Sequence, residues 1–203
     1  DYDGYQMAGL AAYDFATQQL LFRANDANYG CTDMTYDHST STMYGVVCMH
    51  GGTKVQNYLA KINLANGQHT KVADLEDKIM AIACSYDGKM YAMGITSNFY
   101  RLNKQNGELT LIGNNGENIA TDQVQSLEFD HDTNRLYWMA IDSYLMTFYA
   151  EVNVQDGSLI SYNSTPDNTL LGGIYIPFTS PGSGGQQQMV DVVQNLEAVP
   201  DGN

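Results

Sequence analysis

Residues 79–113 read IMAIACSYDGKMYAMGITSNFYRLNKQNGELTLIG and contain four short apolar runs, each closed by polar turn residues. Runs of this length, rich in Tyr, Ile and Met and bounded by Asp-Gly or Asn-Gly, predict four antiparallel strands joined by hairpins. One such sheet cannot bury both of its own faces, so we expect neighbouring sheets of the same kind. The stretch therefore predicts a repeat architecture.

The same unit recurs along the chain, with full copies at residues 33–75, 79–113 and 124–163. Equivalent second strands carry Tyr44, Tyr91 and Tyr137, which are 47 (91 − 44) and 46 (137 − 91) residues apart. The last hairpin of each copy is written NLANG, NKQNG or NVQDG, where Gly, Asn or Asp supplies the positive φ of a tight turn. No stretch has helical periodicity. A period of roughly 40 to 50 residues with four strands per period predicts an all-β fold, a β-propeller of four-stranded antiparallel blades.

Incomplete units stand at both ends of this repeat region. Residues 170–178, LLGGIYIPF, resemble a first strand without partners, and residues 5–25 resemble outer strands without a first strand. Because unpaired apolar edges favour aggregation, we expect the two segments to pair as a composite blade. The expected propeller spans residues 1–178, with about four blade equivalents, either self-contained or as part of a larger propeller. Residues 179–188 are typical of a flexible linker, and residues 189–203 of the truncated start of a further β domain.

The composition excludes two classes of partner. Nine basic against 23 acidic residues give a net charge of −14, which repels a phosphate backbone and an anionic membrane surface. No apolar run approaches the roughly 20 residues of a membrane span, so neither nucleic-acid binding nor membrane insertion is expected. No signal peptide opens the sequence, so we expect the chain to begin either after processing or inside a longer protein, and we favour the second. The acidity fits an extracellular or cell-surface location.

The three cysteines match neither a zinc motif nor a redox motif. Cys48 and Cys84 lie in apolar runs and are interpreted as buried free thiols. The alternative is one disulfide that involves Cys31 in a loop.

Several segments together resemble a known family: DMTYDHSTSTMYG, INLANGQHTKV, FDHDTNRLYW and GGIYIPF, followed by a Gly/Ser linker and VQNLEAVPDGN. The set resembles large secreted surface proteins of gut-dwelling anaerobic bacteria, in which a divergent propeller precedes fibronectin type III and other adhesin-like modules. The resemblance implies surface binding or adhesion, and it implies no catalytic residues.

Metal and catalytic motifs are incomplete throughout the sequence. Residues 130–134, DHDTN, begin like an EF-hand loop, but Arg135 replaces the glycine and Ile141 the bidentate glutamate, so we expect a polar turn capped by Asp130. The four histidines have no ligand spacing. No nucleophile, base and orienting acid can be recognised, and no catalytic residue, metal or cofactor is predicted.

Candidate ligand-binding residues come mainly from the loops after second and fourth strands, which vary in length, whereas the other turns are uniformly tight. Variable loops on a rigid scaffold are where recognition usually resides, and their Asn and Asp content, with a few aromatics, suits a polar neutral ligand such as a glycan. For Trp138 the alternative interpretation is packing between blades. The candidates are Asp33, His50, Asn98, Asp122, Trp138 and Tyr144.

Three functions follow from these observations. The leading hypothesis is a secreted or cell-surface, non-catalytic binding or adhesion module, with a glycan, a host or extracellular protein, or other domains of the same polypeptide as partner. The second is a propeller hydrolase or lyase, with Asp33 and Glu128 holding a divalent ion over the ring axis. The third is a structural spacer or assembly subunit.

Overall fold

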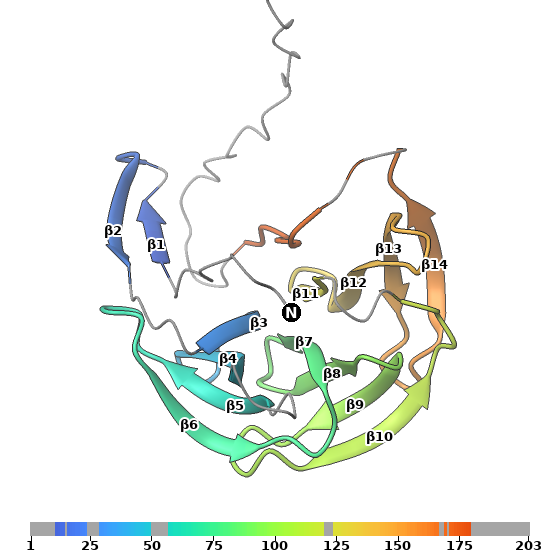
Figure 1. The fold of residues 1–203 in the computed structure, drawn as a ribbon, viewed down its shortest axis with the longest axis horizontal. Coiled ribbons are helices and arrows are strands. Elements are labelled where there is room, and N and C mark those ends of the chain that lie inside the picture. Colours follow the sequence, from blue (N-terminus) through green and yellow to red (C-terminus); the bar gives the residue numbers. More distant parts are fainter. Residues whose placement is uncertain are drawn as a thin grey trace, which may run out of the picture.

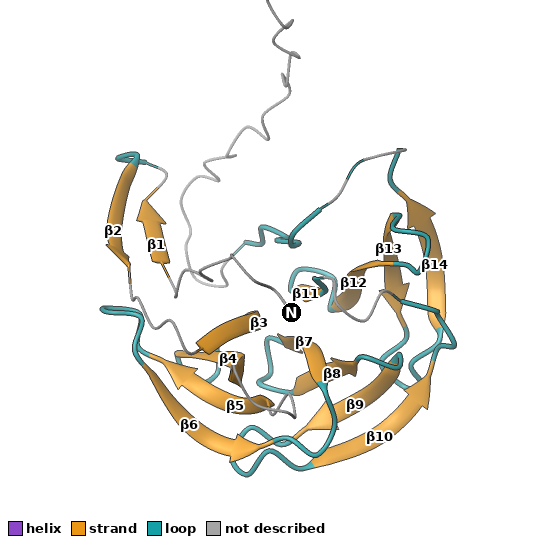
Figure 2. Ribbon diagram, viewed as in Figure 1, coloured by secondary structure: helices purple, strands orange, loops and turns teal. Residues whose placement is uncertain are grey.

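The structure is a computed structural model that describes residues 11–14, 16–23, 29–49, 57–119, 124–166, 169 and 171–179. These residues form fourteen strands and no helix (Figure 2). Twelve of the strands make three four-stranded antiparallel sheets in simple up-and-down order. The prediction of an all-β propeller with four-stranded blades is confirmed.

The three complete sheets follow one another around the ring in Figure 1. The first contains β3 (Tyr29–Asp37), β4 (Thr42–Met49), β5 (Asn57–Ile62) and β6 (His69–Asp74). The second contains β7 (Ile79–Cys84), β8 (Met90–Gly94), β9 (Asn98–Leu102) and β10 (Leu109–Asn114). The third contains β11 (Ser126–Asp130), β12 (Arg135–Ile141), β13 (Thr147–Val152) and β14 (Leu159–Ser164). In each sheet the first strand lies nearest the ring axis and the fourth lies outermost.

Hairpin chemistry explains why each sheet turns where it does. In the third turn of every sheet, the N–H of a glycine donates to the carbonyl of the asparagine four residues earlier: Gly67 to Asn63, Gly107 to Asn103 and Gly157 to Asn153, at 2.7, 2.8 and 2.8 Å. These glycines have φ of 70°, 75° and 77°, a conformation that costs a side-chain-bearing residue about 1 kcal/mol or more. In the first turn of the third sheet, Asp130 accepts the N–H of Asp132 and the hydroxyl of Thr133, as predicted for a polar turn.

The core lies between the sheets. Tyr44, Val46 and Leu59 of the first sheet pack on Ile82 and Met90 of the second. On its opposite face the second sheet packs against the third, and that interface buries Tyr91, Phe99, Phe129, Trp138 and Phe148. The second sheet therefore buries both faces, and the first and third sheets each bury one face against it, as expected for blades.

The predicted composite blade does not form among the described residues. β1 (Ala11–Asp14) and β2 (Gln19–Arg23) pair only with each other, and residues 171–179 contain no strand. Residues 171–179 instead cross the centre of the ring in Figure 1. Side-chain contacts hold them there, and Pro177 has no N–H to give to a sheet ladder. Residues 5–10, residue 170 and the expected segments beyond Thr179 lie outside the described residues.

All three cysteines, Cys31, Cys48 and Cys84, are free thiols, and Cys48 and Cys84 are buried as predicted. The described part of the chain holds no helix that could cross a membrane.

Candidate functional site

The inner strands β3, β7 and β11 are sheet edges, so N–H groups that face the ring axis need acceptors other than a neighbouring strand. Asp33 on β3 supplies one. Its Oδ2 accepts the N–H of Ile82 at 2.9 Å and the N–H of Leu127 at 3.1 Å, and its Oδ1 accepts the Ser126 hydroxyl at 3.3 Å. Burial raises the pKa of Asp33 to about 8, although these hydrogen bonds lower it. Asp33 thus joins three inner strands.

An aromatic cluster closes the ring axis at one end. His38, Tyr86 and His131 each stand in the first turn of their sheet, and Phe178 lies among them. The Phe178 ring centroid is 4.8 Å from that of His38 and 4.7 Å from that of His131. Thr179 extends this attachment by donating its N–H to the Asp132 carboxylate at 3.1 Å. We call the four rings the axial cluster.

Burial lowers the pKa of His131 in the axial cluster, with the nearby charge of His38 acting in the same direction. The His131 Nδ1 atom is buried and has no hydrogen-bond partner among the described residues. Glu128 lies beside it, with its Oε1 4.0 Å from His131 Nε2, and burial raises the pKa of Glu128 to about 7. Among the described residues no three His, Cys, Asp or Glu side chains lie close enough to hold a metal ion.

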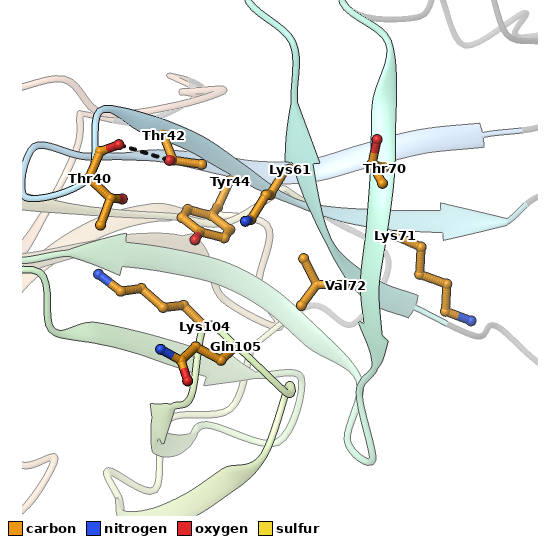
Figure 3. Close-up of a pocket in the computed structure, with 9 residues that line it drawn as sticks. All are labelled: Thr40, Thr42, Tyr44, Lys61, Thr70, Lys71, Val72, Lys104 and Gln105. Atoms are coloured by element: carbon orange, nitrogen blue, oxygen red, sulfur yellow. Dashed lines mark hydrogen bonds between the residues drawn. The ribbon is translucent and has the colours of Figure 1, made fainter.

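A cleft of about 480 Å³ opens between the first and second sheets. It lies at the end of the sheets that carries the tight hairpins, which we call the turn face. Three lysines, three threonines, an amide, a phenol and one apolar side chain line the cleft: Lys61, Lys71, Lys104, Thr40, Thr42, Thr70, Gln105, Tyr44 and Val72. In Figure 3 the Lys61 side chain is directed toward the Tyr44 ring, while Lys104 and Gln105 approach from the second sheet. The cleft is thus the polar mouth of an interface whose interior is apolar.

A second pocket, of about 430 Å³, adjoins the cleft over the turn face of the second sheet. Lys104 and Gln105 line both cavities, so the two are neighbours. The second pocket adds Lys89, Arg101 and Thr110, together with the acidic residue Glu108. Five of the nine basic residues of the chain, Lys61, Lys71, Lys89, Arg101 and Lys104, therefore line these two cavities.

Lys104 fixes one wall of the cleft. Its ammonium group contacts the Asp37 carboxylate and lies 3.4 Å from the Ser39 hydroxyl. Burial raises the pKa of Asp37, but hydrogen bonds from Lys104, Ser39 and Thr40 outweigh it and hold that pKa well below its usual range. The ion pair between Lys104 and Asp37 joins the second sheet to the first across the cleft.

The residues predicted from sequence do not form one site. Asp33 is a cross-link at the axis, and Trp138 is completely buried, with its Nε1 donating to Gln125 Oε1 at 3.1 Å. For Trp138 the alternative interpretation, packing between blades, is the one the structure supports, because a buried ring is out of reach of a ligand at the surface. Neither residue is placed where the ligand-binding prediction needs it.

Two other candidates lie at the ends of strands on the opposite, loop face. Asn98 donates to the Tyr100 hydroxyl at 3.1 Å and accepts from the Asn114 amide at 2.7 Å. Tyr144 stands in the loop between β12 and β13 and is 85% exposed. His50 and Asp122 lie outside the described residues.

Sequence reasoning missed the basic residues of the turn face because they are far apart in the chain. A signal was present, since Lys61, Arg101 and Glu151 each stand two residues before the repeated turn asparagine. Alignment of the copies on those asparagines exposes a position that carries a charge in every copy.

No protein-family model matches the sequence, and no curated protein matches it. Solved structures that resemble the fold include BamB from Moraxella catarrhalis (TM-score 0.40, 14% identity, 71% of this chain and 40% of that one). Another is the β-propeller domain of the Trilobed protease from Pyrococcus furiosus (TM-score 0.42, 16% identity, 69% of this chain and 44% of that one). A third is TolB from Acinetobacter baumannii (TM-score 0.45, 11% identity, 73% of this chain and 36% of that one). The chain spans less than half the length of each. The likeness is one of fold alone.

Proposed function

We propose that this propeller is a non-catalytic binding module whose ligand enters the cleft between the first and second sheets. The observation that carries the proposal is the cleft itself, about 480 Å³ of space lined by hydroxyl, amide and ammonium groups. A concave site with several convergent polar groups on rigid strands is the usual form of a small-ligand site. Lys104, Lys61 and Tyr44 come from one turn and two strands of two sheets, so the fold fixes their positions.

An extracellular or cell-surface setting is part of the proposal. The net charge of −14 and the resemblance of the repeat motifs to adhesin-like surface proteins support it. In that setting the module would bind a glycan or an extracellular protein, with no chemistry of its own.

A metal-dependent enzyme finds less support in the geometry. Both Asp33 oxygens accept hydrogen bonds from the protein, which leaves that carboxylate poorly placed to bind an ion together with Glu128.

An assembly subunit is a second candidate, favoured by exposed apolar side chains on β2 and β14. Leu21 on β2 is 64% exposed and Ile160 on β14 is 60% exposed. Exposed apolar positions on outer strands are a usual feature of contact surfaces between protein chains or domains.

The test is a glycan array followed by titration calorimetry on the wild-type chain and two variants. Thr70 is exposed on the outer strand β6, so Thr70→Trp fills the cleft without disturbing the core. We expect Thr70→Trp to abolish binding and the loop-face variant Tyr144→Ala to retain it.

Retained binding in Thr70→Trp together with lost binding in Tyr144→Ala would show that the ligand binds at the loop face instead. Absence of binding to any arrayed glycan, together with a concentration-dependent increase of mass in light scattering, would support the assembly subunit instead.

A further inference from the structure

One row of side chains crosses each sheet at the same register. In the first sheet Tyr44 pairs with Lys61, and Lys61 pairs with Thr70. The second sheet repeats the row as Tyr91, Arg101 and Thr110. In the third sheet the row reads Tyr137, Glu151 and Ser161. A phenol, a charged group and a hydroxyl thus recur in all three sheets, with a cation in two of them.

The cations of the first two rows are free of carboxylates. Lys61 is exposed and makes no ion pair or side-chain hydrogen bond with any described residue. The Arg101 guanidinium lies 4.7 Å from the Tyr91 ring centroid and has no carboxylate partner in the described chain. In the third row, by contrast, the Glu151 carboxylate is held by Arg135.

Other basic residues nearby contribute less net charge. Lys71 pairs with Asp74 at 2.6 Å and Lys89 with Asp87 at 2.8 Å. Lys104 is engaged by Asp37. Lys61 and Arg101 are therefore the two cations of the neighbouring cavities that make no ion pair with a described residue, on a protein that otherwise repels anions through its net charge of −14.

We propose that the two cavities bind an acidic glycan, with the carboxylate or sulfate of one sugar at Lys61 and that of a nearby sugar at Arg101. This inference rests on the proposed function and names the ligand class for the same site. The Tyr44 phenol and the Thr70 hydroxyl of the first row line the cleft, and the Thr110 hydroxyl of the second row lines the second pocket. The shared residues Lys104 and Gln105 line both.

The lining favours a sugar over an acidic peptide. A carboxylate side chain needs little more than a cation, whereas this cleft adds three threonine hydroxyls, the Tyr44 phenol and the Gln105 amide. Neutral donors and acceptors at this density match the many hydroxyl groups of a saccharide. A volume of about 480 Å³ also falls within the usual range for a small-molecule site, roughly 300 to 1,000 Å³.

The experiment compares matched polymers on the full chain by titration calorimetry. Oligogalacturonate supplies carboxylates, its methyl-esterified form supplies the same sugars without charge, and dextran sulfate with plain dextran repeats the comparison for sulfate. Poly-L-glutamate tests an acidic polypeptide. The variants are Lys61→Gln, Arg101→Gln and the double variant.

Lys78→Gln is the control, because it removes the same charge from the residue before β7, at the loop face. All four variants should keep the wild-type unfolding temperature, which separates loss of binding from loss of fold.

We expect each single substitution to weaken binding of at least one acidic glycan by about tenfold, and the double variant by more, as removal of a charge-assisted hydrogen bond would. Lys78→Gln should bind like the wild type, and affinity should fall as salt rises.

Three results would overturn the inference. Equal binding of the charged and neutral polymers, lost in Thr70→Trp, would leave the binding module intact but remove the acidic ligand. Tighter binding of poly-L-glutamate than of any glycan would replace the glycan by an acidic polypeptide. No binding of any polymer would remove the proposed function as well.

Discussion

The Asp33 carboxylate on β3 accepts the backbone N–H of Leu127 on β11 at 3.1 Å, across 94 residues of chain. The same Oδ2 atom accepts the N–H of Ile82 on β7. Sheets one and three, which are not neighbours in the repeat order, are thereby linked directly. This contrasts with repeat arrays in which each unit contacts only the next.

Replacement of Asp33 should therefore depend on what the new side chain can accept. Asparagine can place its carbonyl oxygen where Oδ2 lies and donate to Ser126, whereas alanine leaves two buried N–H groups without an acceptor. We expect Asp33→Ala to lower the free energy of unfolding by about 2 to 4 kcal/mol and Asp33→Asn by less than about 1 kcal/mol. Urea denaturation at pH 7 measures both. Equal losses in the two variants would show that the cross-link contributes little.

Asp33 should also affect how the free energy of unfolding depends on pH. The pKa of Asp33 is raised by burial to about 8, against about 3.9 in an unfolded chain, and the pKa of Glu128 is raised to about 7. Between the unfolded and the folded pKa of each carboxyl group, the folded state holds a proton that the unfolded state has released. The free energy of unfolding therefore falls as the pH rises from 5 to 8.

Asp33→Asn should flatten this fall in urea titrations at several pH values. The titration of His131 is common to both proteins and cancels in the comparison. If the free energy of unfolding changed with pH by the same amount in the wild type and the variant, the raised pKa of Asp33 would be contradicted.

Gly157 and Gly116 form a matched pair of backbone positions. Their φ values are 77° and 78°, but a Cβ at Gly157 would lie 3.0 Å from the Cβ of Phe99, whereas one at Gly116 would meet nothing within 4 Å. Both alanine variants should carry the strain of a positive φ, roughly 1 kcal/mol. Only Gly157→Ala should add about 1 to 3 kcal/mol for overpacking between the second and third sheets. Equal unfolding midpoints in denaturant would exclude the predicted contact.

Trp138 is the largest completely buried side chain, and its ring meets Phe148 edge-on at 5.0 Å between centroids. Trp138→Ala should lower the free energy of unfolding by about 3 to 5 kcal/mol, since it opens a cavity and leaves Gln125 unpaired. Tyr144→Ala, at an exposed aromatic of the same sheet, should change it by less than about 0.5 kcal/mol. Thermal unfolding followed by near-ultraviolet circular dichroism compares them.

Phe178 should anchor residues 171–179 at the ring axis. In Phe178→Ala we expect the N–H of Thr179, which donates to Asp132, to exchange faster with deuterium. Tyr175→Ala in the same segment removes an aromatic ring that is 76% exposed and should leave that exchange unchanged. Hydrogen exchange read by mass spectrometry tests the pair, and identical protection in both variants would argue against the anchor.

Local chemistry made most of the fold predictable. The glycines of NLANG, NKQNG and NVQDG marked hairpins because their positive φ is a property of a few residues. The pairing of residues 171–179 was not predictable in the same way. LLGGIYIPF has the composition of a strand, but Phe178 and Thr179 find partners at the axis that only the assembled ring provides.

The candidate site was harder to predict than the fold. Trp138 attracted attention as the only tryptophan, yet the alternation that places it opposite Tyr137 also buries it between sheets. Lys61 and Arg101 carried no motif by themselves. Their equivalence becomes visible only when the strand pairings of the first two sheets are aligned, because Lys61 pairs with Tyr44 and Arg101 with Tyr91.

The charged position of the cross-sheet row also has an evolutionary consequence. Lys61 and Arg101 line cavities at the turn face and Glu151 pairs with Arg135, so this position differs in charge between the units, while the apolar positions nearby pack in the core. In the first two units this charge can change without a compensating change in an ion-pair partner, whereas in the third unit Glu151 is held by Arg135. Selection could then retune the ligand preference of one blade at a time.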